Sequence, residues 1–188
     1  MADIVKLFIK TSEQFGDAVR EITPQQWNGP TPCSEWDVRA LVKHLVYEVL
    51  WVPPMLEGKT IAEVGDQFEG DVLGDDPAAA WEDAIAGARD AVNAPGATTV
   101  TTHLSFGDFP GEEYITQVAF DLFVHGWDLR TAIGADATMD DEFLTAIMPW
   151  ATKTMDAYRA AGAVGPMPPV PDGASAQTKL LAMTGRKG

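Results

Sequence analysis

The sequence contains little cysteine and little basic charge, and it has no long apolar run. A single cysteine, Cys33, among 188 residues excludes an internal disulfide and any zinc site built from several cysteines. Lys and Arg number 13 against 28 Asp and Glu, and the net charge of −15 argues against nucleic acid or anionic membranes as partners. No segment approaches the roughly 20 apolar residues of a membrane helix, and the first residues lack the features of a signal peptide. We therefore expect a cytoplasmic protein whose partners are small molecules.

The residues that are present favour one folded helical domain over 1–188. Hydrophobic residues make up 46% and charged residues 22%, which is ordinary for a globular protein. Apolar residues recur at helical spacing, and a Thr-rich stretch near 98–106 is β-prone. The prediction is an all-α bundle of four main helices with long connections, a further helix and a docked tail, 165–188. The expected helices cover 4–22, 36–57, 77–92, 112–133 and 140–161, with a short one at 176–183. Pro53-Pro54 should bend or end the second of them.

The helix expected over 112–133 carries an unusual polar flank. Its other sides are apolar, which is typical of a buried helix. Asp121, His125 and Asp128 are spaced by four and three residues, so all three project from one face. Burying charge there is costly unless the carboxylates are paired or bound to a metal.

The helix expected over 36–57 repeats this arrangement with His44 and Glu48, four residues apart. If the two flanks face one another, His44, Asp121 and His125 form a set of two histidines and one carboxylate. Such a set suits Zn²⁺, Fe²⁺, Ni²⁺ or Mn²⁺ and leaves coordination positions open. Two alternatives remain. Asp121 and His125 could form a metal-free hydrogen-bonded pair, and Asp128 could replace Asp121 as a ligand or orient an imidazole nitrogen.

Two motifs resemble a known group of proteins. They are the segment 31–46, TPCSEWDVRALVKHLV, and the pattern Asp121-x-x-x-His125-Gly-Trp-Asp128. Both are similar to actinobacterial metal-binding proteins of the DinB-like superfamily, which are related to the N-terminal domain of mycothiol-dependent maleylpyruvate isomerase; the likeness extends to the tail. The resemblance implies a DinB-like four-helix bundle that binds a divalent metal through His44, Asp121 and His125. Zinc is the first expectation for the metal, and nickel, iron and manganese are alternatives.

The resemblance also implies a reaction class. The chain is too short for the isomerase's C-terminal domain, so we do not expect isomerase activity. We expect a thiol-dependent S-transferase in which mycothiol, bound to the metal as a thiolate, attacks a small electrophile. Glu48 and Asp128 are the candidate catalytic residues, which would orient ligands or relay a proton. Tyr114 and Gln117 share the flank of Asp121 and are candidates for lining the cofactor pocket.

Other interpretations stay open at this stage. The protein could be a non-catalytic module that binds metal or a small ligand in a stress response, or a metal-free bundle that acts through protein contacts, and a homodimer is compatible with either. For Cys33 we favour a packed small residue over a reactive thiol. Trp36 is expected first as a core anchor and second as a pocket wall, His103 as an exposed loop residue, and Tyr47 is given no role.

Overall fold

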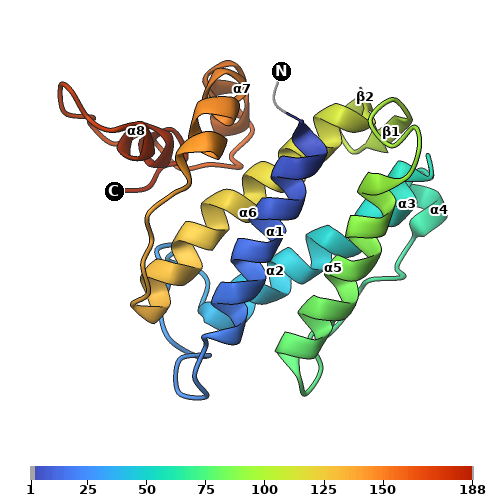
Figure 1. The fold of residues 1–188 in the computed structure, drawn as a ribbon, viewed down its shortest axis with the longest axis horizontal. Coiled ribbons are helices and arrows are strands. Elements are labelled where there is room, and N and C mark those ends of the chain that lie inside the picture. The colour runs from blue at the N-terminus through green and yellow to red at the C-terminus, as the bar shows by residue number, and fades with distance from the viewer. Residues whose placement is uncertain (1–2, 188) are drawn as a thin grey trace. The chain divides into compact units, whose positions relative to one another are not determined.

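The computed structural model describes residues 3–187, and in this part of the chain the fold is all-α with one short β-hairpin (Figure 1). The prediction of an all-α fold with a short β excursion is confirmed. No helix among the described residues is long and apolar enough to cross a membrane. In chain order the elements are α1 Ile4–Arg20, α2 Val38–Leu50, α3 Val52–Leu56, α4 Ile61–Val64, α5 Pro77–Asn93, β1 Thr101–Leu104, β2 Gly107–Pro110, α6 Gly111–Ile133, α7 Asp141–Ala160 and α8 Ala176–Met183.

Residues 3–137 form one compact unit around four long helices. Helix α1 packs along α6 and α5, and α2 packs along the same two helices, so the four enclose a common core. Figure 1 shows α1 and α6 lying side by side. Burial of each large apolar side chain stabilises such a core by about 1.5–3 kcal/mol. The largest side chains buried in this unit are Trp81, Phe8, Phe15, Leu41, Leu45, Met55, Ile85, Ile115, Leu122 and Leu129.

The helix expected over 36–57 is interrupted next to Pro53-Pro54, the two prolines expected to bend or end it. Helix α2 begins at Val38, where the carboxylate of Asp37 accepts a hydrogen bond from the Ala40 amide at 2.8 Å, and it ends at Leu50. A separate short helix, α3, follows Trp51. Because Pro53 has no amide hydrogen and its ring clashes with the carbonyl one turn earlier, the first helix cannot continue through it.

The hairpin determines where α6 begins. Strands β1 and β2 pair antiparallel, with Thr101 opposite Pro110, so the β-structure extends four residues past the expected segment. The next residue, Gly111, donates its amide hydrogen to the Val100 carbonyl at 2.8 Å. A Cβ at Gly111 would lie 1.8 Å from the Ala97 carbonyl oxygen, so only glycine fits this approach. The contact fixes the start of the helix that carries Asp121 and His125.

Residues from 138 onward form a second compact unit, in which α7 and α8 pack together. The Arg159 guanidinium donates to the Met183 carbonyl at 2.7 Å, and the Gln177 side chain accepts from the Met139 amide at 2.9 Å. The two bonds tie α8 to the rest of this unit. The prediction of a single domain with a docked tail at 165–188 stays a prediction.

Candidate metal centre

Helices α2 and α6 bring two histidines and an aspartate together. The His44 Nε2 atom lies 3.0 Å from Asp121 Oδ2, and the His125 Nε2 atom lies 3.4 Å from Asp121 Oδ1. All three potential ligand atoms lie within 4.8 Å of one another. Since Asp121 and His125 are one turn apart on α6, the helix itself sets their spacing. The structure therefore places the three expected ligands in one cluster, and their role as ligands stays a prediction.

The second nitrogen of His125 faces a buried carboxylate. Its Nδ1 atom lies 2.8 Å from Asp128 Oδ2, and the Asp128 side chain is wholly inaccessible to solvent. An ionised carboxylate accepts the Nδ1 hydrogen, which leaves the Nε2 lone pair directed toward Asp121 and available to a metal. Of the two sequence-based interpretations of Asp128, this geometry favours the one in which it orients the imidazole.

The turn before α2 places Cys33 and Trp36 beside these histidines. The Thr31 hydroxyl donates to the Trp36 carbonyl at 2.8 Å and accepts from the Cys33 amide at 3.1 Å. The Cys33 thiol in turn donates to Asp128 Oδ2 at 3.3 Å. Cys33 is thus a half-buried polar neighbour of the cluster.

Trp36 contacts both imidazoles. Its ring centroid lies 4.7 Å from that of His44 and 5.4 Å from that of His125, with tilted planes. An indole at this place shields the ring nitrogens from bulk water and limits the orientations of both rings. Trp36 is half-buried and acts as a wall of the site, the second of the two roles considered for it.

The electrostatics of the site reflect an excess of carboxylates. Burial and the neighbouring Asp121 raise the pKa of Glu48 to about 7, against the opposing effect of His44, whose Nδ1 atom lies 3.9 Å from Glu48 Oε1. Burial lowers the pKa of His44, but its hydrogen bond to Asp121 and the two nearby carboxylates outweigh it, so the net shift is upward. Burial and then the Glu48 charge raise the pKa of Tyr114. A cation bound here would reduce the repulsion between the Glu48 and Asp121 carboxylates.

Tyr114 and Gln117, the two residues expected to line the cofactor pocket, have different surroundings. Tyr114 is buried close enough to Glu48 to sense its charge, whereas the Gln117 amide donates to Glu113 Oε1 at 3.3 Å, one turn earlier on α6. Neither lines the groove described next, and their assignment to cofactor binding stays a prediction.

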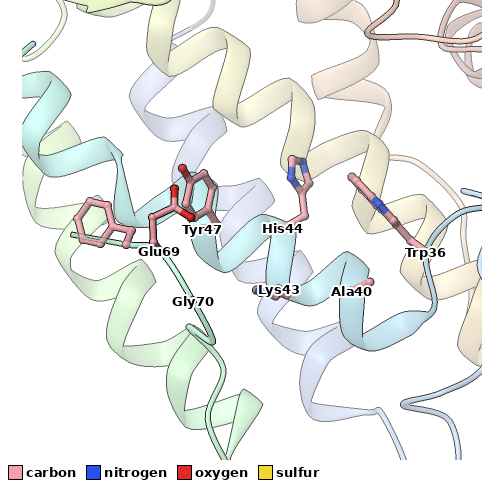
Figure 2. Close-up of a pocket in the computed structure, with 8 residues that line it drawn as sticks. Trp36, Ala40, Lys43, His44, Tyr47, Glu69 and Gly70 are labelled. Carbon is pink, nitrogen blue, oxygen red and sulfur yellow. The ribbon is translucent and has the colours of Figure 1, made fainter. Parts of the chain in front are cut away.

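A groove of about 430 Å³ opens beside His44. Figure 2 shows His44 between Trp36 on one side and Tyr47 and Glu69 on the other. The remaining lining residues are Ala40, Lys43, Phe68 and Gly70. Tyr47 had been given no role, yet its spacing of three residues from His44 puts both on one face of α2 and could have indicated it. Nothing in the sequence pattern pointed to Phe68, which comes from the loop after α4.

His103, by contrast, lies outside the cluster. It belongs to β1, where its Nδ1 atom lies 2.8 Å from Asp108 on the paired strand. This position makes His103 a matched control for the two histidines of the cluster.

The donor set fits a divalent metal. Two imidazole nitrogens and a carboxylate oxygen suit zinc and the other first-row ions, and three protein ligands leave positions open for a small molecule. His44 lines the groove, so those positions have a route to solvent.

Known proteins match the part of the chain that carries this cluster. The family model described as the mycothiol maleylpyruvate isomerase N-terminal domain matches residues 10–130. Two relatives from Mycobacterium tuberculosis are each 31% identical over 71% of this chain and 69% of their own length. They are uncharacterized protein MT0763 of strain CDC 1551 / Oshkosh and uncharacterized protein Rv0738 of strain ATCC 25618 / H37Rv. No solved structure matches the chain significantly. Because the family match covers well over half of the sequence, this chain belongs to the mycothiol maleylpyruvate isomerase N-terminal domain family.

Proposed function

We propose that this protein is a metal- and thiol-dependent S-transferase that joins mycothiol, or a similar small thiol, to a small electrophile. The observation that carries the proposal is the cluster of His44, Asp121 and His125 at the wall of an aromatic groove. The membership of the chain in the mycothiol maleylpyruvate isomerase N-terminal domain family supports mycothiol as the thiol. Zinc is the metal we propose first, because it suits nitrogen and oxygen ligands and needs no redox partner.

His44, Asp121 and His125 would hold the metal, each through one side-chain atom. A divalent ion with open positions supplies positive charge that lowers the pKa of a bound thiol toward neutrality. Asp128 contributes by keeping the Nδ1 hydrogen of His125 in place, so that Nε2 faces the ion.

Glu48 is the proposed proton acceptor. Its carboxylate lies beside His44, and with a pKa of about 7 it exchanges protons readily near neutral pH. The charge of a bound ion would lower this pKa, so that Glu48 would be ionised when the thiol arrives. Glu48 Oε1 would then take up the thiol proton and release it to solvent, while the leaving group departs with the electron pair of the bond that breaks.

The groove would hold the organic parts of the two reactants. The rings of Trp36, Tyr47 and Phe68 offer apolar faces that exclude water, and Lys43 and Glu69 offer polar groups nearer solvent. Pockets of this size with aromatic walls and a few polar groups are typical of small-molecule sites.

The test combines metal analysis with a transfer assay. Purified protein loaded with Zn²⁺ is mixed with mycothiol and a fluorogenic alkyl halide, and formation of the thioether is followed. We expect turnover in the wild-type protein and a loss of at least about 100-fold in His44→Ala, since charge stabilisation by the metal amounts to several kcal/mol. His103→Ala serves as the control and should keep its activity.

Two results would contradict the proposal. Protein that binds metal but forms no thioether would instead be a binding module without turnover. If the purified protein takes up no metal at all, the remaining interpretation is a metal-free bundle that acts through protein contacts.

A further inference from the structure

A second set of potential metal ligands lies on the other side of His125. The Cys33 Sγ atom is 3.3 Å from Asp128 Oδ2 and 3.9 Å from His125 Nδ1, and the latter two atoms are 2.8 Å apart. The three come from separate places, the turn before α2 and two successive turns of α6. This thiol, imidazole and carboxylate are distinct from the His44 and Asp121 atoms on the opposite edge of the ring.

These separations suit a single ion. Zinc binds sulfur at about 2.3 Å and nitrogen or oxygen at about 2.0–2.2 Å, which in a tetrahedral arrangement puts neighbouring ligand atoms about 3.3–3.6 Å apart. The three observed distances, 2.8, 3.3 and 3.9 Å, bracket this range. Small side-chain adjustments would therefore complete the arrangement.

The burial of the three residues also favours an ion. Asp128 is wholly buried and His125 is 7% exposed, so the carboxylate charge is held away from water. Bonds from His125 and Cys33 offset part of the cost of burying this charge, and a bound cation would offset more of it. Cys33 is only partly buried, which gives an ion access from solvent.

We propose that Cys33, His125 and Asp128 form a second metal position, selective for thiophilic divalent ions such as Zn²⁺ and Cd²⁺. A thiolate ligand favours these ions over Mn²⁺ or Mg²⁺. Binding releases the thiol proton of Cys33 to solvent, and the Nδ1 proton of His125 moves to Nε2 through water, so one proton leaves the protein for each ion bound.

The two metal positions compete for His125. A neutral imidazole has one lone pair, so coordination through Nδ1 puts the proton on Nε2 and removes that atom from the cluster with His44 and Asp121. The chain consequently binds one ion at a time through His125, at the position that the softness of the ion selects.

Cadmium provides the test, because a cadmium–thiolate bond has an ultraviolet charge-transfer band and Cys33 is the only thiol. The chain is titrated with Cd²⁺, with an ion competitor to measure affinity. We expect the band to saturate at one ion per chain in the wild-type protein and in His44→Ala, and to disappear in Cys33→Ser. In Asp128→Asn the affinity should fall about 10- to 100-fold, because the amide is a poor ligand and no longer orients His125.

The result separates this position from the first one. Cys33→Ser should still bind Zn²⁺ through His44, Asp121 and His125, so the second position can fail while the proposed function stands. Absence of the band in wild-type protein would overturn the proposal. A band with unchanged affinity in both Asp128→Asn and His125→Ala would also overturn it, since the thiol would then be binding cadmium alone.

Discussion

His125→Ala is expected to lose metal binding and to unfold more readily. The substitution removes a proposed ligand of the His44 cluster, so metal affinity should fall by more than the roughly 10- to 100-fold caused by losing a residue behind a ligand. It also deprives Asp128, a wholly buried carboxylate, of its imidazole partner at 2.8 Å. The Cys33 thiol still donates to this carboxylate, so the loss of one hydrogen bond to a charged group should cost about 1.5–3 kcal/mol. Chelator competition measures the first effect, and urea denaturation of the metal-free protein measures the second.

A second variant separates the two roles of His125. In His125→Asn the side-chain amide lies near the place of Nδ1 and can donate to Asp128, but nothing replaces Nε2. We expect this variant to recover most of the lost stability and none of the metal affinity, while His103→Ala changes neither. Equal loss of stability in the alanine and asparagine variants would show that the hydrogen bond from residue 125 to Asp128 does not contribute to the stability of the protein.

The other large effect is expected at Gly111, the first residue of the helix that carries Asp121 and His125. In Gly111→Ala the added Cβ would lie 1.8 Å from the Ala97 carbonyl oxygen. This clash can be removed only if the backbone moves, and the movement breaks the hydrogen bond from the Gly111 amide to the Val100 carbonyl. Overpacking of this kind costs typically about 1–3 kcal/mol, and we expect the upper end because neither atom belongs to a flexible side chain. The midpoint of urea denaturation should fall accordingly.

Gly126→Ala is the matched control on the same helix. There the nearest atom to an added Cβ is a Phe15 ring carbon at 4.0 Å, an ordinary contact. Alanine is the better helix former, so stability should stay the same or rise by up to about 1 kcal/mol. If both variants unfolded at the same urea concentration, the close approach at Gly111 would not be restrictive.

The sequence predicted most of the helices because their burial follows helical spacing. The short helix at 176–183 matches α8, and the start near Pro77 matches α5, since a proline in the first turn is a strong local signal. The helix over 36–57 breaks at Trp51, beside the prolines expected to bend or end it, although the apolar pattern continues past this point. Periodicity reports which face is buried and carries no information on whether the backbone is continuous.

Part of the candidate site could also be predicted from helical spacing. The spacing of Asp121 and His125 on one helix, with His44 on another, was enough to predict a cluster whose atoms lie within 4.8 Å in the structure. The approach of Cys33 to Asp128 and of Phe68 to the groove could not be predicted. Both depend on irregular turns, whose paths are set by hydrogen bonds such as those of Thr31 and not by a repeating pattern.

The position of Trp36 gives the metal centre an optical property. Its indole contacts both imidazoles, at centroid distances of 4.7 and 5.4 Å, and it is one of six tryptophans in the chain. Any ion bound by either histidine must lie close to this fluorophore. A paramagnetic ion such as Ni²⁺ would quench the emission, whereas Zn²⁺ would change only the polarity around the ring. Trp36 would thus report which ion occupies the proposed metal centre.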